Sequence, residues 1–95
     1  MNIRFTQDTV DDLIRLREFI GVKNPLAANR IANELKTGIN KLVTFPELGL
    51  KVEQALEPEK IRDLFIGEYT IRYLISKAEI VILRLWHDKE NARNG

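Results

Sequence analysis

Two arginines and one histidine lie in or next to apolar, strand-like segments, where their side chains could act on an anion. They are Arg62, Arg84 and His87. A guanidinium suits bidentate contact with a phosphate or a carboxylate, and a histidine pKa of about 6.5 suits acid–base catalysis. An arginine on a strand can equally pair with a carboxylate such as Asp63 or Glu79, or extend its head group to solvent. Both interpretations stay open at this stage.

Other kinds of chemistry find less support among the residues. The chain has no cysteine and one histidine, and no second ligand lies at a diagnostic spacing, so we expect no metal and no cofactor. Tyr69, Tyr73 and Trp86 could stack on nucleic-acid bases. They alternate with isoleucines, which favours packing in the core instead. There is no glycine-rich phosphate loop and no nucleophile elbow.

Composition predicts one folded domain over residues 1–95. Apolar residues make up 44% and charged residues 31%, both within the range of globular proteins. A chain of 95 residues can build only a thin core. Fifteen basic side chains against 14 acidic ones leave a net charge of +1, too small for a global field that attracts nucleic acid. The lack of cysteine, of an apolar leader and of a run of ~20 apolar residues favours a cytoplasmic protein without a membrane partner.

Hydrophobic periodicity predicts the elements in the first half of the chain. Alternation over residues 2–6 indicates a short strand. A helix should follow, capped by Asp8 or Thr9 and ended by Gly21. Asn24-Pro25 is typical of a second helix start, and the next residues form one apolar helical face: Ala28, Ile31, Ala32, Leu35, Ile39 and Leu42. Two helices joined by so short a turn are expected to form an antiparallel hairpin.

After a loop at residues 45–49 the period changes to two, which predicts strands over 61–66, 69–76 and 79–86. Gly67 suits a type II′ hairpin turn. The predicted fold class is therefore α+β, in the order β-α-α-β-β-β, with a helical hairpin packed on a small, largely antiparallel sheet.

Two-residue turns fix the register of such a meander if no bulge intervenes. Arg62 then lies opposite Tyr73, which lies opposite Ile82. On that count one face carries Arg62, Tyr69, Tyr73, Arg84 and Trp86. The other face carries Ile61, Phe65, Leu74, Val81, Leu83 and Leu85. The pattern leaves open which face the helices cover.

This order of elements and several short strings resemble the RelE/ParE toxin superfamily along nearly the whole chain. The strings are Asp12-Leu13, Asn24-Pro25 with Ala27-Ala28, Phe45-Pro46-Glu47-Leu48-Gly49, Ile61-Arg62-Asp63-Leu64, Tyr69-Thr70-Ile71-Arg72-Tyr73 and Ile82-Leu83-Arg84-Leu85-Trp86-His87. The resemblance implies the toxin of a type II toxin–antitoxin system. Its partner would be a cognate antitoxin, and operator DNA would be reached only through that antitoxin.

The superfamily has two functional branches. ParE-like members inhibit DNA gyrase, and RelE-like members cut messenger RNA in the ribosomal A site. The ending Arg84-Leu85-Trp86-His87 resembles the gyrase branch, which implies a non-enzymatic toxin. Its target-binding residues would be Arg62, Arg84, Trp86 and His87.

The alternative is a metal-independent endoribonuclease, which needs a base, an acid and cations around the phosphate. Arg62, Arg84 and His87 would then be catalytic, with Lys51 and Glu53 as weaker candidates. The tyrosine that ribonuclease members commonly carry near the C-terminus is absent here, since none follows Tyr73. A small adaptor domain without toxicity is a third hypothesis.

Overall fold

The computed structural model describes residues 1–90, and their elements run in the predicted order with one addition. They are β1 (Asn2–Phe5), α1 (Gln7–Lys23), α2 (Pro25–Thr44), β2 (Leu50–Lys51), β3 (Ile61–Ile66), β4 (Tyr69–Ile75) and β5 (Glu79–His87). The short strand β2 was not predicted. Two residues are too few to show an alternating pattern, and β2 exists because Leu50 and Lys51 pair with β3.

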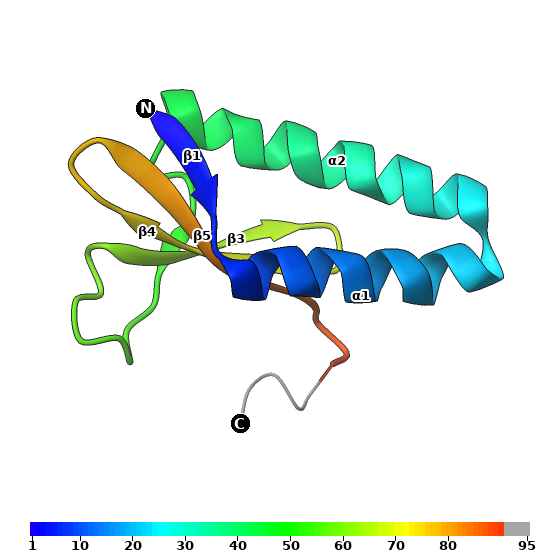
Figure 1. The fold of residues 1–95 in the computed structure, drawn as a ribbon. Helices are drawn as coiled ribbons and strands as arrows, with labels where there is room; N and C mark the ends of the chain where they lie inside the picture. The colour runs from blue at the N-terminus through cyan, green and yellow to red at the C-terminus, as the bar shows by residue number, and fades with distance from the viewer. Residues whose placement is uncertain (91–95) are drawn as a thin grey trace.

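The five strands form one sheet in the order β1-β5-β4-β3-β2. β1 is parallel to β5, and the other neighbours are antiparallel. The two helices run in opposite directions and pack on this sheet as a hairpin (Figure 1). The α+β prediction of a helical hairpin on a largely antiparallel sheet is therefore confirmed.

The ends of the helices follow from their capping side chains. Thr6 caps α1, because its hydroxyl accepts a hydrogen bond from the amide of Thr9 at 3.1 Å. The predicted caps Asp8 and Thr9 are therefore wrong, and so is the predicted end at Gly21, since α1 continues to Lys23. The predicted cap of α2 is confirmed: the Asn24 side chain accepts from the amide of Ala27 at 3.1 Å.

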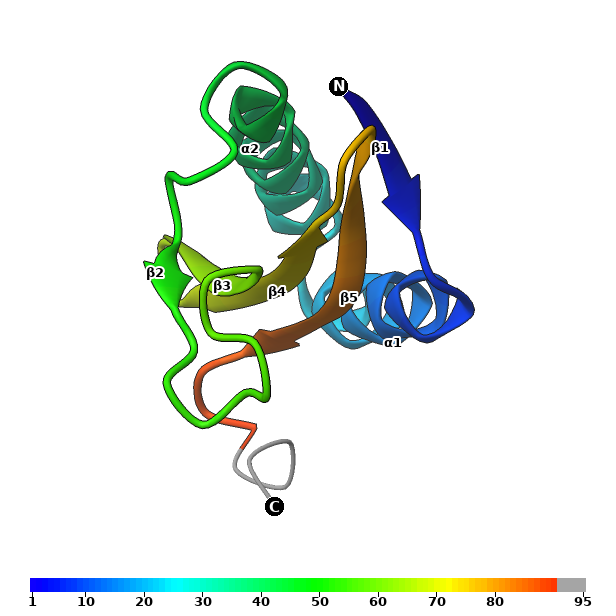
Figure 2. The same ribbon diagram turned by 90° about the vertical axis from the view of Figure 1, so that its left-hand side faces the viewer.

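The helices cover the sheet face that carries Tyr69 and Tyr73. Along α2, Leu35, Ile39 and Leu42 are buried, as the periodicity predicted, whereas Ala32 is exposed. Their partners in the core are Leu16, Leu64, Ile71, Tyr73, Ile80, Ile82 and Leu85. Figure 2 shows α1 alongside β5 and α2 above the sheet. Neither helix is long and apolar enough to cross a membrane.

A bulge in β5 overturns half of the predicted register. The pairs from Ile75–Ile80 to Tyr73–Ile82 are as predicted. The next pair is Arg72 with Arg84, so Leu83 is an extra residue in β5. One inserted residue moves every later side chain to the opposite face. Arg84 and Trp86 consequently leave the face of Arg62, and Leu85 enters the core. The prediction that Arg62, Arg84 and Trp86 share a face is therefore wrong.

Candidate functional site

Side chains at the start of α1 form hydrogen bonds with the backbone of β5 beyond the end of β1. β1 pairs with residues 79–82 only. Beyond it, the Thr9 hydroxyl donates to the Ile82 carbonyl at 2.7 Å and the Thr6 hydroxyl donates to the Leu83 carbonyl at 3.1 Å. The Asp12 carboxylate accepts from the Leu85 amide at 2.9 Å. Spacing of three residues places these side chains on one stripe of the helix, which satisfies backbone groups that a strand would otherwise pair.

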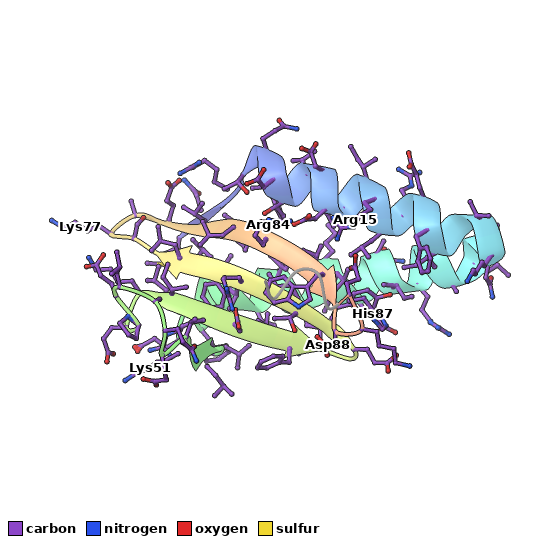
Figure 3. All side chains as sticks on the ribbon, turned by 90° about the horizontal axis from the view of Figure 1, so that it is seen from below. Arg15, Lys51, Lys77, Arg84, His87 and Asp88 are labelled. Carbon is purple, nitrogen blue, oxygen red and sulfur yellow. The ribbon has the colours of Figure 1, made fainter. Side chains whose placement is uncertain are left out.

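The buried carboxylate of Asp12 is the centre of an ion cluster on this stripe, whose arginines are partly exposed. Its carboxylate is 2% exposed and accepts from Arg84 Nε at 2.8 Å, Arg84 Nη2 at 3.0 Å and Arg15 Nη1 at 2.6 Å. Burial acts to raise the pKa of this carboxyl, but the hydrogen bonds from Arg84, Arg15 and the Leu85 amide outweigh it and hold the pKa below its ordinary value. Figure 3 shows Arg15 and Arg84 in the space between α1 and β5.

The cluster extends to the last described residues. Arg15 Nε lies 3.2 Å from a carboxylate oxygen of Glu90, and the other oxygen of Glu90 accepts from the His87 amide at 2.9 Å. The segment after β5 is also held by the Thr70 hydroxyl, which donates to Asp88 at 2.6 Å. The end of the described chain is thus tied to α1 and to β4.

A second arginine stands next to Arg84 on the face of the sheet that the helices leave open. Arg72 is the register partner of Arg84 and donates to Asp63 from Nε at 2.9 Å and from Nη2 at 3.0 Å. This hydrogen bonding with Asp63 raises the pKa of Arg72 above its ordinary value. The Arg72 guanidinium also lies 5.2 Å from the centre of the Trp86 ring, within range of a cation–π contact. We call Arg72, Arg84 and Trp86 the open-face cluster.

Arg62 lies on the other face, where it holds a loop in place. It is 8% exposed, and its Nη1 donates to the carbonyls of Gly49 at 3.0 Å and Glu47 at 3.4 Å. Tyr73 supports the same loop, since its hydroxyl donates to the Pro46 carbonyl at 2.6 Å and accepts from the Gly49 amide at 2.9 Å. Neither suggested carboxylate partner is used, because Asp63 pairs with Arg72 and Glu79 pairs with Arg4. In this structure Arg62 holds the loop at residues 46–49, and its Nη2 also lies 3.9 Å from a carboxylate oxygen of Glu47.

The remaining predicted residues lie in two separate places. Lys51 is the register partner of Arg62 and pairs with Glu59 at 2.8 Å, while Glu53 is exposed in the loop that follows. His87 is at the far end of β5, edge-on to the Tyr69 ring with 5.0 Å between ring centres. Its Nδ1 accepts from the Lys89 amide at 3.1 Å, and its Nε2 lies 3.5 Å from Glu68.

The register gives the separation between these places. Arg62 is level with Ile82 across two strands, whereas His87 is five residues further along β5 and level with Ile66, the last residue of β3. With 3.3 Å per residue over the four residues from Arg62 to Ile66 and 4.8 Å per strand, the backbones of Arg62 and His87 are about 16 Å apart. The structure therefore brings Lys51 next to Arg62 and Arg84 next to Trp86, but it does not unite the two groups. Among residues 1–90, no group of three His, Asp or Glu side chains could hold a metal ion.

Asp12, Arg15 and Arg72 were not among the predicted site residues. Arg72 could have been found, because the first hairpin fixes Asp63 opposite it and opposite charges across a ladder are a pairing signal. Asp12 and Arg15 share a helical stripe with Thr9, but their partners lie 70 or more residues away. No local pattern marks that contact.

Comparison with known proteins places the chain in a family. Residues 3–92 match the family described as "ParE toxin of type II toxin-antitoxin system, parDE". The chain belongs to the ParE toxin family. It is 34% identical over 84 residues to "Toxin RelE2" of Caulobacter vibrioides, an alignment that covers 87% of this chain and 90% of that toxin. The fold is similar to a solved structure titled "Chromosomal ParDE TA system from P. aeruginosa", with a TM-score of 0.76 at 18% identity over 92% of this chain and 95% of that one.

Membership of the ParE toxin family gives the chain its general function. It is the toxin of a type II toxin–antitoxin system within the RelE/ParE superfamily, and a cognate antitoxin is its partner. The resemblance seen in the sequence is thereby confirmed.

Proposed function

We propose that this ParE-family toxin inhibits DNA gyrase by binding it, without chemistry of its own. A cognate antitoxin neutralises it, and operator DNA is contacted only through the antitoxin. The observation that carries this proposal is the dispersal of the residues that RNA cleavage would need. A base, an acid and cations must surround one phosphate, whereas here about 16 Å separates the backbones of Arg62 and His87.

The surroundings of Arg62 also support binding over catalysis. Arg62 is buried and donates to the carbonyl of Gly49 in the loop at residues 46–49. A cation that stabilises a transition state must be able to reach the reacting oxygens. The match to a family defined by ParE toxins supports the same choice.

The open-face cluster is the surface that we propose for contact with gyrase. The side chains of Arg72 and Arg84 are each 37% exposed, and each guanidinium keeps an Nη1 group beyond its bidentate pair with an aspartate. These donors suit carboxylate or carbonyl groups of a protein surface. Of the predicted target-binding residues, Arg84 and His87 are partly exposed and can contact a partner. Trp86 lies against the Arg72 guanidinium, and Arg62 holds the loop at residues 46–49.

Two assays run side by side test the proposal with the purified chain: supercoiling by gyrase, and cleavage of messenger RNA in the A site of ribosomes. We expect supercoiling to be inhibited and the message to remain intact. Arg72→Gln should weaken inhibition about 5- to 30-fold, as loss of a contact worth 1–2 kcal/mol does. Lys36→Gln, an exposed change on the outer side of α2, should leave inhibition unaltered.

The ribonuclease alternative predicts the reverse pattern, and the name of the Caulobacter relative, Toxin RelE2, keeps it worth testing. His87→Gln would then lower cleavage by a general acid–base factor of about 10² to 10⁴. In a gyrase inhibitor the same change should have a modest effect. Ribosome-dependent cleavage with supercoiling intact would overturn the proposal and return Lys51, Glu53, Arg62, Arg84 and His87 to a catalytic role.

A further inference from the structure

A pocket lies at the end of the sheet where β4 leads into β5, beside the loop at residues 46–49, and we call it the loop pocket. Its volume is about 800 Å³, within the range of small-molecule sites. Half-buried Pro46 and Ile75 contribute apolar walls, and exposed charged side chains form the rim. Arg62 is the one buried residue of the lining and forms the floor. Figure 3 shows Lys77, a rim residue, at the end of the sheet opposite His87.

The charge of Arg62 has no close counter-ion. Nη1 donates to two loop carbonyls, but Nε is buried without a hydrogen-bond partner, and Nη2 makes no hydrogen bond within residues 1–90. The one ion-pair contact of Arg62 in this part of the chain is a Glu47 oxygen 3.9 Å from Nη2, and the Glu47 side chain is 71% exposed. A nearly buried cation without a hydrogen-bonded anion is costly. Arg62 is therefore suited to an anionic ligand.

The charges around the pocket favour a ligand with a single negative charge. The lining contains three cations, Lys60, Arg62 and Lys77, and three carboxylates, Glu47, Glu57 and Glu59. Glu59 also pairs with Lys51, from outside the lining, at 2.8 Å, so four cations face three carboxylates. Lys77 is exposed and, within residues 1–90, forms no ion pair. A small positive excess complements a monoanion better than a phosphate dianion.

The loop beside the pocket is held in place before any ligand binds. The Tyr73 hydroxyl donates to the Pro46 carbonyl at 2.6 Å and accepts from the Gly49 amide at 2.9 Å. A preorganised wall lowers the entropy cost of binding. Because Arg62 lies at the floor, a small molecule or the end of a chain can reach it. A phosphate inside an RNA strand cannot, because it carries a sugar on each side.

We propose that the loop pocket binds the carboxylate of an apolar ligand, with Arg62 as its counter-ion and Lys77 as a contact at the rim. A guanidinium suits a carboxylate, and the apolar walls suit an aliphatic or aromatic body. A small organic acid and the C-terminal residue of a polypeptide share this chemistry. The open-face cluster lies on the other face of the sheet from Arg62, so this site and the proposed gyrase contact can fail separately.

Calorimetric titration of the full chain with N-acetyl-leucine tests the pocket. We expect a Kd on the order of 1 mM, as for a ligand of this size. N-acetyl-leucinamide lacks the negative charge and acetate lacks the apolar body, so each should bind at least about 10-fold more weakly. An acetylated tripeptide that ends in leucine with a free carboxylate separates the two sources. Tighter binding than N-acetyl-leucine indicates a chain end, and equal or weaker binding indicates a small acid.

Glu47→Gln tests the role of Arg62 directly and should leave the fold intact, because the Glu47 side chain is exposed. It removes the carboxylate that competes for Nη2, so N-acetyl-leucine should bind about 2- to 5-fold more tightly. The matched control is Glu53→Gln, at an exposed position outside the pocket, which should leave the Kd unaltered. Arg62→Gln should abolish measurable binding. If that variant does not fold, Lys77→Gln on the exposed rim should still weaken binding about 2- to 5-fold.

Several results would overturn the proposal. Binding of the amide as tightly as the acid, or equal affinities for Glu47→Gln and Glu53→Gln, would show that Arg62 is not the counter-ion. Tighter binding of inorganic phosphate than of N-acetyl-leucine would show that the carboxylate assignment is wrong. If none of these compounds binds at about 10 mM, a concentration well above the expected Kd, the pocket is not a site for this ligand class.

Discussion

Replacement of Asp12 by alanine should strongly lower the stability of the fold. The carboxylate is 2% exposed and serves three partners: the Leu85 amide, Arg84 and Arg15. A buried amide that loses a charged acceptor costs about 1.5–3 kcal/mol. The two arginine pairs are partly exposed, so after screening they add about 0.5–1 kcal/mol each. Alanine returns about 0.5 kcal/mol through its higher helix propensity. The expected loss is about 3 kcal/mol.

Urea denaturation followed by circular dichroism measures this loss directly. For a chain of this size it corresponds to a fall in Tm of about 12–24 °C. The matched control is Asp11→Ala, since Asp11 is exposed on the same helix and its side chain accepts only from Gln7 among the described residues. That variant should stay within about 0.5 kcal/mol of wild type. A loss below about 1 kcal/mol for Asp12→Ala would refute the view that this carboxylate organises the edge of β5.

Three further predictions concern the loop at residues 46–49, two glycines in the helices and the titration of Asp12. Tyr73→Phe should cost about 1–3 kcal/mol in urea denaturation, because it removes the partner of the buried Gly49 amide and of the partly buried Pro46 carbonyl. Tyr69→Phe, whose hydroxyl has no hydrogen bond in residues 1–90, should cost less than 0.5 kcal/mol. Gly38→Ala should lower the Tm, because the new Cβ would lie 2.1 Å from the end of the Ile66 side chain. Gly21→Ala has no atom within 4 Å of its new Cβ and should raise the free energy of unfolding by about 0.5–1 kcal/mol. The difference in unfolding free energy between wild type and Asp12→Asn should be constant near neutral pH. It should shrink as pH falls from the ordinary carboxyl pKa of 3.8 through the lowered pKa of the folded state, because a carboxyl with a lowered pKa contributes stability only while it is ionised. A difference that grows on acidification would contradict the lowered pKa of Asp12.

Local sequence patterns predicted several features that depend on neighbours along the chain, although the cap and the end of α1 were predicted wrongly. Asn24 and Pro25 start a helix through their own backbone and side-chain chemistry, and the turn at Gly67, with φ of +58°, is the first position of the predicted type II′ hairpin. The pairing of β3 with β4 follows from that turn alone. The element order and the fold class rest on features of this kind.

The candidate site depended on features that no local pattern shows. The bulge at Leu83 comes at the end of the apolar run over residues 80–83, where no glycine marks it, and it changes the face of Arg84, Leu85 and Trp86. Asp12 and Arg84 meet across 72 residues of sequence. Such a contact follows from how α1 lies on β5, which is a consequence of the tertiary packing.

The reliance of α1 on the edge of β5 also sets an order of events during synthesis. Both β1 and the Thr6–Thr9–Asp12 stripe dock on β5, a strand that leaves the ribosome about 70 residues after them. Chains emerge at roughly 5–20 residues per second, so the N-terminal segments spend several seconds without their partner. During that interval the sheet lacks its second strand, and Arg84 has not yet been translated. The N-terminal segments of this toxin therefore cannot reach their final packing until β5 has been translated.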